Sequence, residues 1–223
     1  MLYGKKYLTV PPCGREHGRM STPGTPRRTP PAPIPLHEHV EADLRYIRTA
    51  IERAGEFTSI SGWGQAVVGL TAFGAAFLAP ATPAQDRWVA IWLGEALVAA
   101  AISVSSAALK AQRLGLPLFG VAGRRFLLAF ATPAAAGIVL TAALVRAGAH
   151  GLLPATWLLT YGAAVTGGGA FSVSSVPAMG VALMATGVLA AFVPPAWANA
   201  ILALGFGAVH VVFGVWIARR HDG

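Results

Sequence analysis

Six long apolar runs fill most of this chain after residue 60, and they restrict its possible folds more than any other feature. They cover residues 61–79, 88–108, 126–145, 154–172, 176–193 and 198–218. Each has about 18–21 residues, and a helix needs about 20 apolar residues to cross the hydrocarbon core of a bilayer. The runs predict an all-α membrane protein, with a bundle of about six transmembrane helices over residues 61–218.

Charge is scarce in this sequence and unevenly placed. Charged residues make up 12% of the chain, against about 25% in soluble domains. Of the 17 Lys and Arg residues, nine precede Trp63, four lie between Lys110 and Arg125, and Arg219 and Arg220 lie near the end. If both termini are cytoplasmic, 15 of the 17 lie inside, as the positive-inside rule requires. A nucleic-acid-binding surface would need Lys and Arg residues interleaved with aromatic residues on one folded surface. The sequence has no such pattern, so no nucleic-acid partner is expected.

The fourth and fifth runs leave an alternative open. The stretch between them, GGGAFSVSSVP, is rich in helix breakers, so the pair could form one re-entrant hairpin instead of two spans. Gly167–Gly169 is either a helix break that faces a cavity or the end of the fourth span, and the end of the span is favoured. A re-entrant pair would leave the orientation of both termini unchanged.

The segments outside the bundle are short. Residues 1–36 contain eight prolines and no apolar periodicity, so a disordered basic, proline-rich tail is expected. Met20 offers an alternative start within it. Residues 37–60 are predicted as a cytoplasmic amphipathic helix with a linker, and residues 219–223 as a cytoplasmic tail.

The amphipathic helix carries an apolar seam. Val40, Leu44, Ile47 and Ile51 follow spacings of 4, 3 and 4, which places them on one face of a helix. This docking seam is too short to form a stable coiled coil alone. It therefore packs on its own membrane domain or the headgroups, or it docks a protein partner or a second copy of the chain.

One acidic residue lies within a predicted span. Glu95 is about 10 Å deep in the second run at 1.5 Å per residue. An ionised side chain there is costly, so such residues are candidates for function. Arg87, His210 or Ser and Tyr hydroxyls on adjacent helices are its candidate partners. Glu95, His210 and Tyr161 form the candidate intramembrane polar site, for ligand or proton binding or for structural hydrogen bonds.

Other polar and aromatic residues have simpler interpretations. The hydroxyls of Ser103, Ser105, Ser106, Thr160 and Thr166 usually bond carbonyls of their own helix. All six tryptophans lie near run ends, which is typical of an aromatic belt. Small residues allow close packing of helices, for which the candidates are Gly69, Gly74, Gly137, Gly162, Gly205, Gly207 and Gly214.

No cofactor, metal or catalytic residue is predicted. Cys13 is the only cysteine, so cysteine-based metal sites are excluded. Haem or copper would need two or more histidines at a suitable depth, and the spans supply one. His37 and His39, beside Glu38 and Glu41, are a weak metal signal.

The stretch LRYIRTAIERAGEFTSISGWG (Leu44–Gly64) resembles the N-terminal signature of an uncharacterised family of bacterial multi-span membrane proteins. In that signature an amphipathic helix runs into an FTxxxGWG-like start of the first span. Ser61 stands here where the signature has proline. The resemblance covers about 21 residues and implies a location in the bacterial inner (cytoplasmic) membrane. It implies no activity and no functional residues.

Two functions are compatible with these patterns. The seam favours a structural or regulatory membrane component whose cytoplasmic helix docks a partner or second copy. Glu95 favours a small transporter or channel, with this residue in the path of the ion or substrate. An intramembrane enzyme would need a paired acid and nucleophile, and the spans lack such a pair.

Overall fold

The structure is a computed structural model that describes Leu44 and residues 59–79, 86–115, 117 and 119–221. Within these residues the chain is helical and contains no strand. The last helical segment is continuous from Pro195 to His221. The helices in order are α2 (Gly62–Leu78), α3 (Asp86–Leu114), α4 (Val121–Arg146), η1 (His150–Leu152), α5 (Leu153–Gly169), α6 (Ser175–Phe192), η2 (Pro195–Trp197), α7 (Ala198–Leu202), the π-helix η3 (Ala203–Val209) and α8 (His210–His221).

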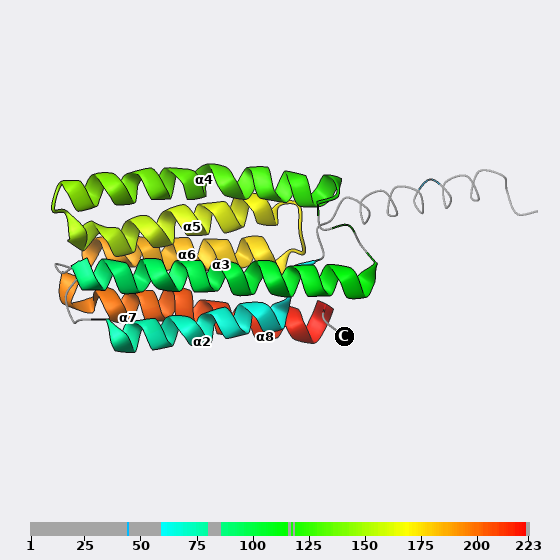
Figure 1. Cartoon of the computed structure of the whole chain (residues 1–223), viewed down its shortest axis with the longest axis horizontal. Coiled ribbons are helices and arrows are strands. Elements are labelled where there is room, and N and C mark those ends of the chain that lie inside the picture. Colours follow the sequence, from blue (N-terminus) through cyan, green and yellow to red (C-terminus); the bar gives the residue numbers. More distant parts are fainter. Residues whose placement is uncertain (1–43, 45–58, 80–85, 116, 118, 222–223) are drawn as a thin grey trace, which may run out of the picture. The chain divides into compact units, whose positions relative to one another are not determined.

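Four helical segments are long and apolar enough to cross a membrane: Asp86–Leu114, Val121–Arg146, Ser175–Phe192 and Pro195–Arg220. α2 and α5 have 17 residues each, slightly fewer than the about 20 that a spanning helix needs. The predicted all-α class is therefore confirmed, while the count of six spans stays a prediction. α5 and α6 lie alongside the longer helices α3 and α4 and are shorter than them (Figure 1).

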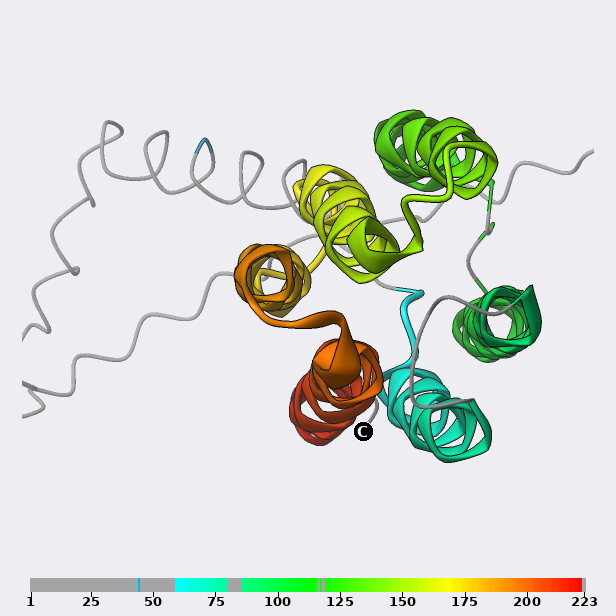
Figure 2. The same ribbon diagram turned by 90° about the vertical axis from the view of Figure 1, so that its left-hand side faces the viewer.

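The helices follow one another around a ring in the order α4, α5, α6, α7–α8, α2 and α3 (Figure 2). α5 packs against both α4 and α6, and α2 packs against both α8 and α3. α3 and α4 are consecutive in the chain but make at most marginal contact with each other. They are therefore the two ends of the series, and most of their apolar side chains are exposed, as expected of helices that face lipid.

Glycines bring α2 into backbone contact with the last helical segment. A Cβ atom placed on Gly69 would lie 2.6 Å from the carbonyl oxygen of Gly207. One placed on Gly214 would lie 2.5 Å from the backbone nitrogen of Ala66. Real Cβ atoms essentially never come within 3.0 Å of such atoms. Larger side chains at these positions would therefore push the two helices apart.

A second pair of helices, α5 and α6, meets in the same way. A Cβ on Gly162 would lie 2.8 Å from the carbonyl oxygen of Gly180, and a Cβ on Gly180 would lie 2.7 Å from that of Gly162. Further along, a Cβ on Gly187 would lie 2.9 Å from the backbone nitrogen of Leu159. Because lipid supplies little hydrophobic drive between helices, this close van der Waals contact is a main source of their association.

The glycines predicted to make close contacts are confirmed except for one. Gly69, Gly162, Gly207 and Gly214 line the two pairs, while Gly137 faces Thr160 and Gly205 faces Leu158. Gly74 is the wrong prediction, because nothing lies within 4 Å of a Cβ placed there. The prediction also missed Gly62, Gly64, Gly180 and Gly187, whose added Cβ atoms would clash with neighbouring helices.

The three consecutive glycines mark the end of a helix, as favoured from the sequence. α5 ends at Gly169, and the backbone N–H of Ala170 still bonds the carbonyl of Thr166. A Cβ on Gly168 would lie 3.1 Å from the ring of Phe126 on α4. The glycines therefore allow α4 and the start of α6 to approach the end of α5 closely.

We predict that Gly214→Ala destabilises the bundle by about 1–3 kcal/mol, because the added methyl overpacks the contact of α8 with α2. Gly74→Ala is the matched control. Its methyl meets open space, and alanine is a better helix former than glycine by about 1 kcal/mol. Thermal unfolding in detergent should show a lower melting temperature for Gly214→Ala alone. Equal melting temperatures for the two variants would contradict the close contact.

Candidate functional site

Glu95 faces α2 from the adjacent helix α3 and is half-buried. Its Oε1 lies 2.9 Å from Oγ1 of Thr71 on α2. The predicted partners Arg87 and His210 are wrong, because among the described residues Glu95 bonds neither of them. The prediction of a hydroxyl partner on an adjacent helix is confirmed, but the hydroxyl is that of a threonine and not of a serine or tyrosine. The short side chain of Thr71 reaches Glu95 because α2 and α3 pack directly on each other.

His210 and Tyr161 come together in the interior. The Tyr161 hydroxyl lies 3.2 Å from His210 Nε2, and the two rings are stacked with centroids 5.6 Å apart. His210 is only 1% exposed. Of the three residues in the predicted polar site, the structure therefore pairs two and gives the third, Glu95, a different partner.

The π-helix η3 directly precedes His210. Nδ1 of the ring is buried and has no hydrogen-bond partner among the described residues, so the contact with Tyr161 at Nε2 is the hydrogen bond that orients the ring. π-Helical turns frequently occur at functional sites.

Aromatic rings continue from this pair through the bundle. Consecutive rings have centroids 5.3 to 6.4 Å apart, a range in which aromatic pairs attract one another. The aromatic series is Trp157, Trp88, Trp92, Phe206, Tyr161, Phe130 and Phe126. It connects α3, α4, α5 and the last helical segment, and it fills the space beside His210.

The aromatic-belt interpretation is correct for only some of the tryptophans. Trp63, Trp197 and Trp216 are exposed, as a belt requires. Trp88 and Trp92 are 0% and 3% exposed, and Trp157 stacks on Trp88 with nearly parallel rings. Position at the end of a run gives the depth of a tryptophan, but not the side of the helix on which it lies.

Asn199 holds three helices together and was missed from the sequence. Its Oδ1 accepts hydrogen bonds from Nε1 of Trp88 at 2.7 Å and Nε1 of Trp92 at 3.2 Å. Its Nδ2 donates to the carbonyl oxygen of Ala79, just after α2, at 3.3 Å. The available signal was an amide near the start of a span, whose polar groups must find partners in lipid.

Two further polar contacts of α3 reach α2 and the residues just before it. Nε2 of Gln65 lies 3.4 Å from Oγ of Ser103, and Nζ of Lys110 donates to the carbonyl of Ile60 at 3.0 Å. As predicted, the hydroxyls of Ser106, Thr160 and Thr166 bond carbonyls of their own helices. α3 is thus attached to α2 by polar contacts at three levels along its length.

Several predicted features lie outside the described residues. They include the tail, the histidines His37 and His39, and the docking-seam residues Val40, Ile47 and Ile51. Leu44 of the docking seam is described as helical, with a side chain that is 60% exposed. Within the described part of the chain, no group of three or more His, Cys, Asp or Glu side chains is placed to hold a metal ion.

We predict that Asn199→Leu lowers the free energy of unfolding by about 1–3 kcal/mol, because two buried indole N–H groups lose their acceptor. Thr132→Val is the matched control, since the Thr132 hydroxyl is exposed and bonds Leu128 of its own helix. Thermal unfolding in detergent, followed by near-ultraviolet circular dichroism of the tryptophans, measures both. If the two variants melted together, the bonds to Asn199 would not hold the helices.

Comparison of the chain with protein-family models, curated proteins and solved structures found no match. The resemblance of Leu44–Gly64 to a bacterial membrane-protein signature therefore stays a prediction from those residues.

Proposed function

We propose that the chain is an integral protein of the bacterial inner membrane with six spans and both termini cytoplasmic. The length of the four long apolar helices supports a membrane location. α2 and α5 run alongside them (Figure 1), which supports counting these two shorter helices as spans. The bacterial origin rests on the resemblance of Leu44–Gly64.

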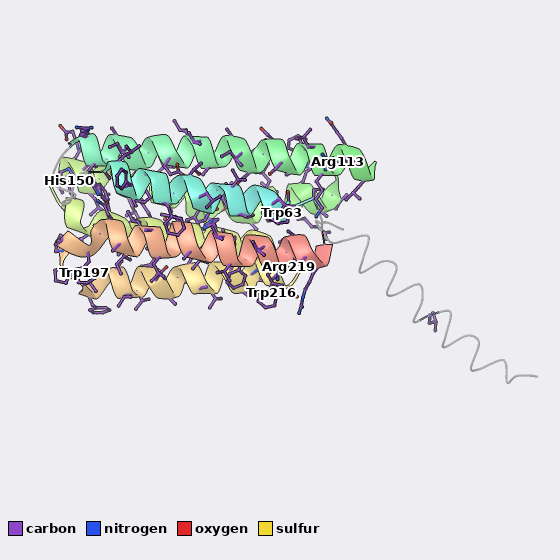
Figure 3. All side chains as sticks on the ribbon, turned by 90° about the horizontal axis from the view of Figure 1, so that it is seen from below. Trp63, Arg113, His150, Trp197, Trp216 and Arg219 are labelled. Atoms are coloured by element: carbon purple, nitrogen blue, oxygen red, sulfur yellow. The ribbon has the colours of Figure 1, made fainter. Side chains whose placement is uncertain are left out.

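The distribution of basic residues supports this orientation. Arg113 and Arg219 lie at the same end of the bundle as Trp63 and Trp216, whereas His150 and Trp197 lie at the opposite end (Figure 3). Because α4 starts where α3 ends, its first turns belong to the end that carries Arg113. This end of the bundle, which we call the basic end, carries Lys110, Arg113, Arg124, Arg125, Arg219 and Arg220. Cytoplasmic loops carry the excess of Lys and Arg, so the basic end is assigned to the cytoplasm.

The chain acts as a structural or regulatory membrane component. Its cytoplasmic helix (residues 37–57) docks a protein partner or a second copy of the chain. A docking helix can influence a membrane bundle only if its attachment is firm. The observation that carries this proposal is the fixed start of α2, immediately after the segment that bears the docking seam.

Four residues, which we call the α2 anchor, fix this start: Ser59, Ile60, Ser61 and Lys110. Ser59 is buried, and Ser61 accepts a hydrogen bond from the backbone N–H of Gly64 at 3.2 Å, as an N-cap. Lys110 of α3 donates to the Ile60 carbonyl. Next to the anchor, Gly62 packs against Ala218 of α8. The start of α2 is thus held by α3 and α8.

A second candidate function is a small transporter or channel with Glu95 in its path. The specific observation in its favour is the half-buried carboxyl group of Glu95 with the Thr71 hydroxyl as its hydrogen-bond partner. Acidic groups within spans are typical of ion pathways. The docking function needs the cytoplasmic helix, whereas the transport function needs Glu95 within the bundle.

The orientation predicts opposite accessibility for two cysteines. With native Cys13 changed to Ser, Ala147→Cys should react with a membrane-impermeant maleimide in intact spheroplasts, because Ala147 follows α4 at the end assigned to the periplasm. Gln112→Cys at the basic end should react only after lysis. Both side chains are exposed in the structure, so burial does not bias the comparison. The reverse labelling pattern would overturn the orientation.

The docking proposal predicts that Val40, Leu44 and Ile47 together changed to Ser abolish association through the cytoplasmic helix. The oligomer size from light scattering in detergent should fall, or a cross-linked partner should disappear. Ala42, Thr49 and Ala50 changed to Ser lie off the docking seam and serve as the matched control. If the first triple variant keeps both the oligomer size and its cross-links, the docking proposal is wrong.

A further inference from the structure

The distances around the Thr71 hydroxyl limit where the protons of its contact with Glu95 can reside. Oγ1 of Thr71 lies 2.9 Å from Oε1 of Glu95 and 2.8 Å from the carbonyl oxygen of Val68. A hydroxyl has one proton to donate and can accept others. One proton makes one well-directed hydrogen bond, and when it is shared between a carboxylate and a carbonyl it makes two weaker ones. Both contacts are full hydrogen bonds only when a proton resides on the carboxyl group of Glu95.

In that arrangement the hydrogens form a short chain. Protonated Glu95 donates to Oγ1 of Thr71, and Thr71 donates to the Val68 carbonyl in its own helix. No ionised group is then placed among the helices. If Glu95 loses the proton, Thr71 can turn its hydrogen to the carboxylate and release Val68, whose carbonyl still faces the backbone N–H of Ala72 within α2.

Among the described residues, no charged side chain is placed to hold Glu95 ionised. α2, which packs against α3 and supplies Thr71, has no titratable residue, and neither do α7 and η3, which contact Trp92 one turn before Glu95. His210, which follows η3, is bonded to Tyr161. On α3 itself the charged residues nearest to Glu95 are Asp86 and Arg87 in the first turn, about 12–14 Å away along the helix at 1.5 Å per residue.

We propose that Glu95 is a proton-binding site that exchanges its proton, with Thr71 as a switch between the two states. The ligand is a single proton that binds a carboxylate oxygen to give the neutral acid, and its release restores the carboxylate. A sodium ion would need several oxygen ligands, whereas the described residues supply a carboxyl group and one hydroxyl. The site is independent of the docking function. If the chain is a transporter or channel, the proposal makes the proton its ion. The site itself does not require transport.

Reaction with a hydrophobic carbodiimide tests this site, because the reagent modifies protonated carboxyl groups from the lipid phase. The full chain in lipid vesicles is treated between pH 5 and pH 9, and the modified residue is located by mass spectrometry. Glu95 should be modified, and the rate should fall about tenfold per pH unit above the midpoint of a single titration. Glu95→Gln should lose the modification. Asp86, in the first turn of α3, should react instead with a water-soluble carbodiimide.

The role of Thr71 is tested separately with a pair of variants. Thr71→Val keeps the side-chain shape but removes the one donor that the described residues place at the ionised carboxylate. Modification of Glu95 should therefore persist to a pH about one unit higher. Thr71→Ser keeps the hydroxyl and should follow the parent chain. An unchanged pH profile in Thr71→Val would overturn the switch.

Two further outcomes would overturn the proton site itself. One is the absence of modification in the folded chain at every pH at which the chain unfolded in dodecyl sulfate does react. The other is protection of Glu95 by sodium ions at constant pH, which would make it a metal-cation site. If Thr71→Val fails to fold, the pH profile of the parent and the loss of modification in Glu95→Gln still decide the question.

Discussion

The backbone contact between α2 and the last helical segment is the interaction on which the other helices depend. Lipid tails are as apolar as the side chains they would replace, so helices in a bilayer associate mainly through close packing and polar bonds. Gly69 meets Gly207, and Gly214 meets Ala66, where only hydrogen atoms leave enough room. α3 in turn packs on α2, and the Asn199 bonds tie α3 to the end of α2. A shift of α2 would therefore move the anchor, Glu95 and the tryptophans together.

The two halves of the bundle use different chemistry. α5 and α6 approach each other closely at Gly162, Gly180 and Gly187, which favours a fixed distance between them. α3 is attached to α2 through a lysine, a serine and a glutamate, whose bonds to Ile60, Gln65 and Thr71 can each be exchanged. Polar bonds between helices contribute about 0.6 kcal/mol on average in membranes. α3 is therefore held to α2 by bonds that can be exchanged at low cost, and it is also the helix that carries the acid.

Run length and composition were enough to predict the class of fold, because lipid requires every spanning segment to satisfy its own backbone. They were also enough to single out Glu95, His210 and Tyr161 as polar groups in the interior. What they could not supply was the rotation of each helix about its axis. That rotation decides that Trp88 points inward while Trp63 does not, that Gly74 is free while Gly69 is not, and that Glu95 meets Thr71. Asn199 escaped notice for the same reason.

The π-helix also affects how the chain tolerates changes in length. Each residue of an α-helix turns the following ones by about 100°, so a deletion in an ordinary helix rotates every later side chain away from its neighbour. A π-helical turn already holds one residue more than an α-helical turn. Removing one residue between Ala203 and Val209 would let the segment wind as an α-helix while His210 and Gly214 kept their facing partners. This short stretch is therefore where the last helix can lose a residue and keep its later side chains in register, provided that the close contacts of Gly205 and Gly207 are kept.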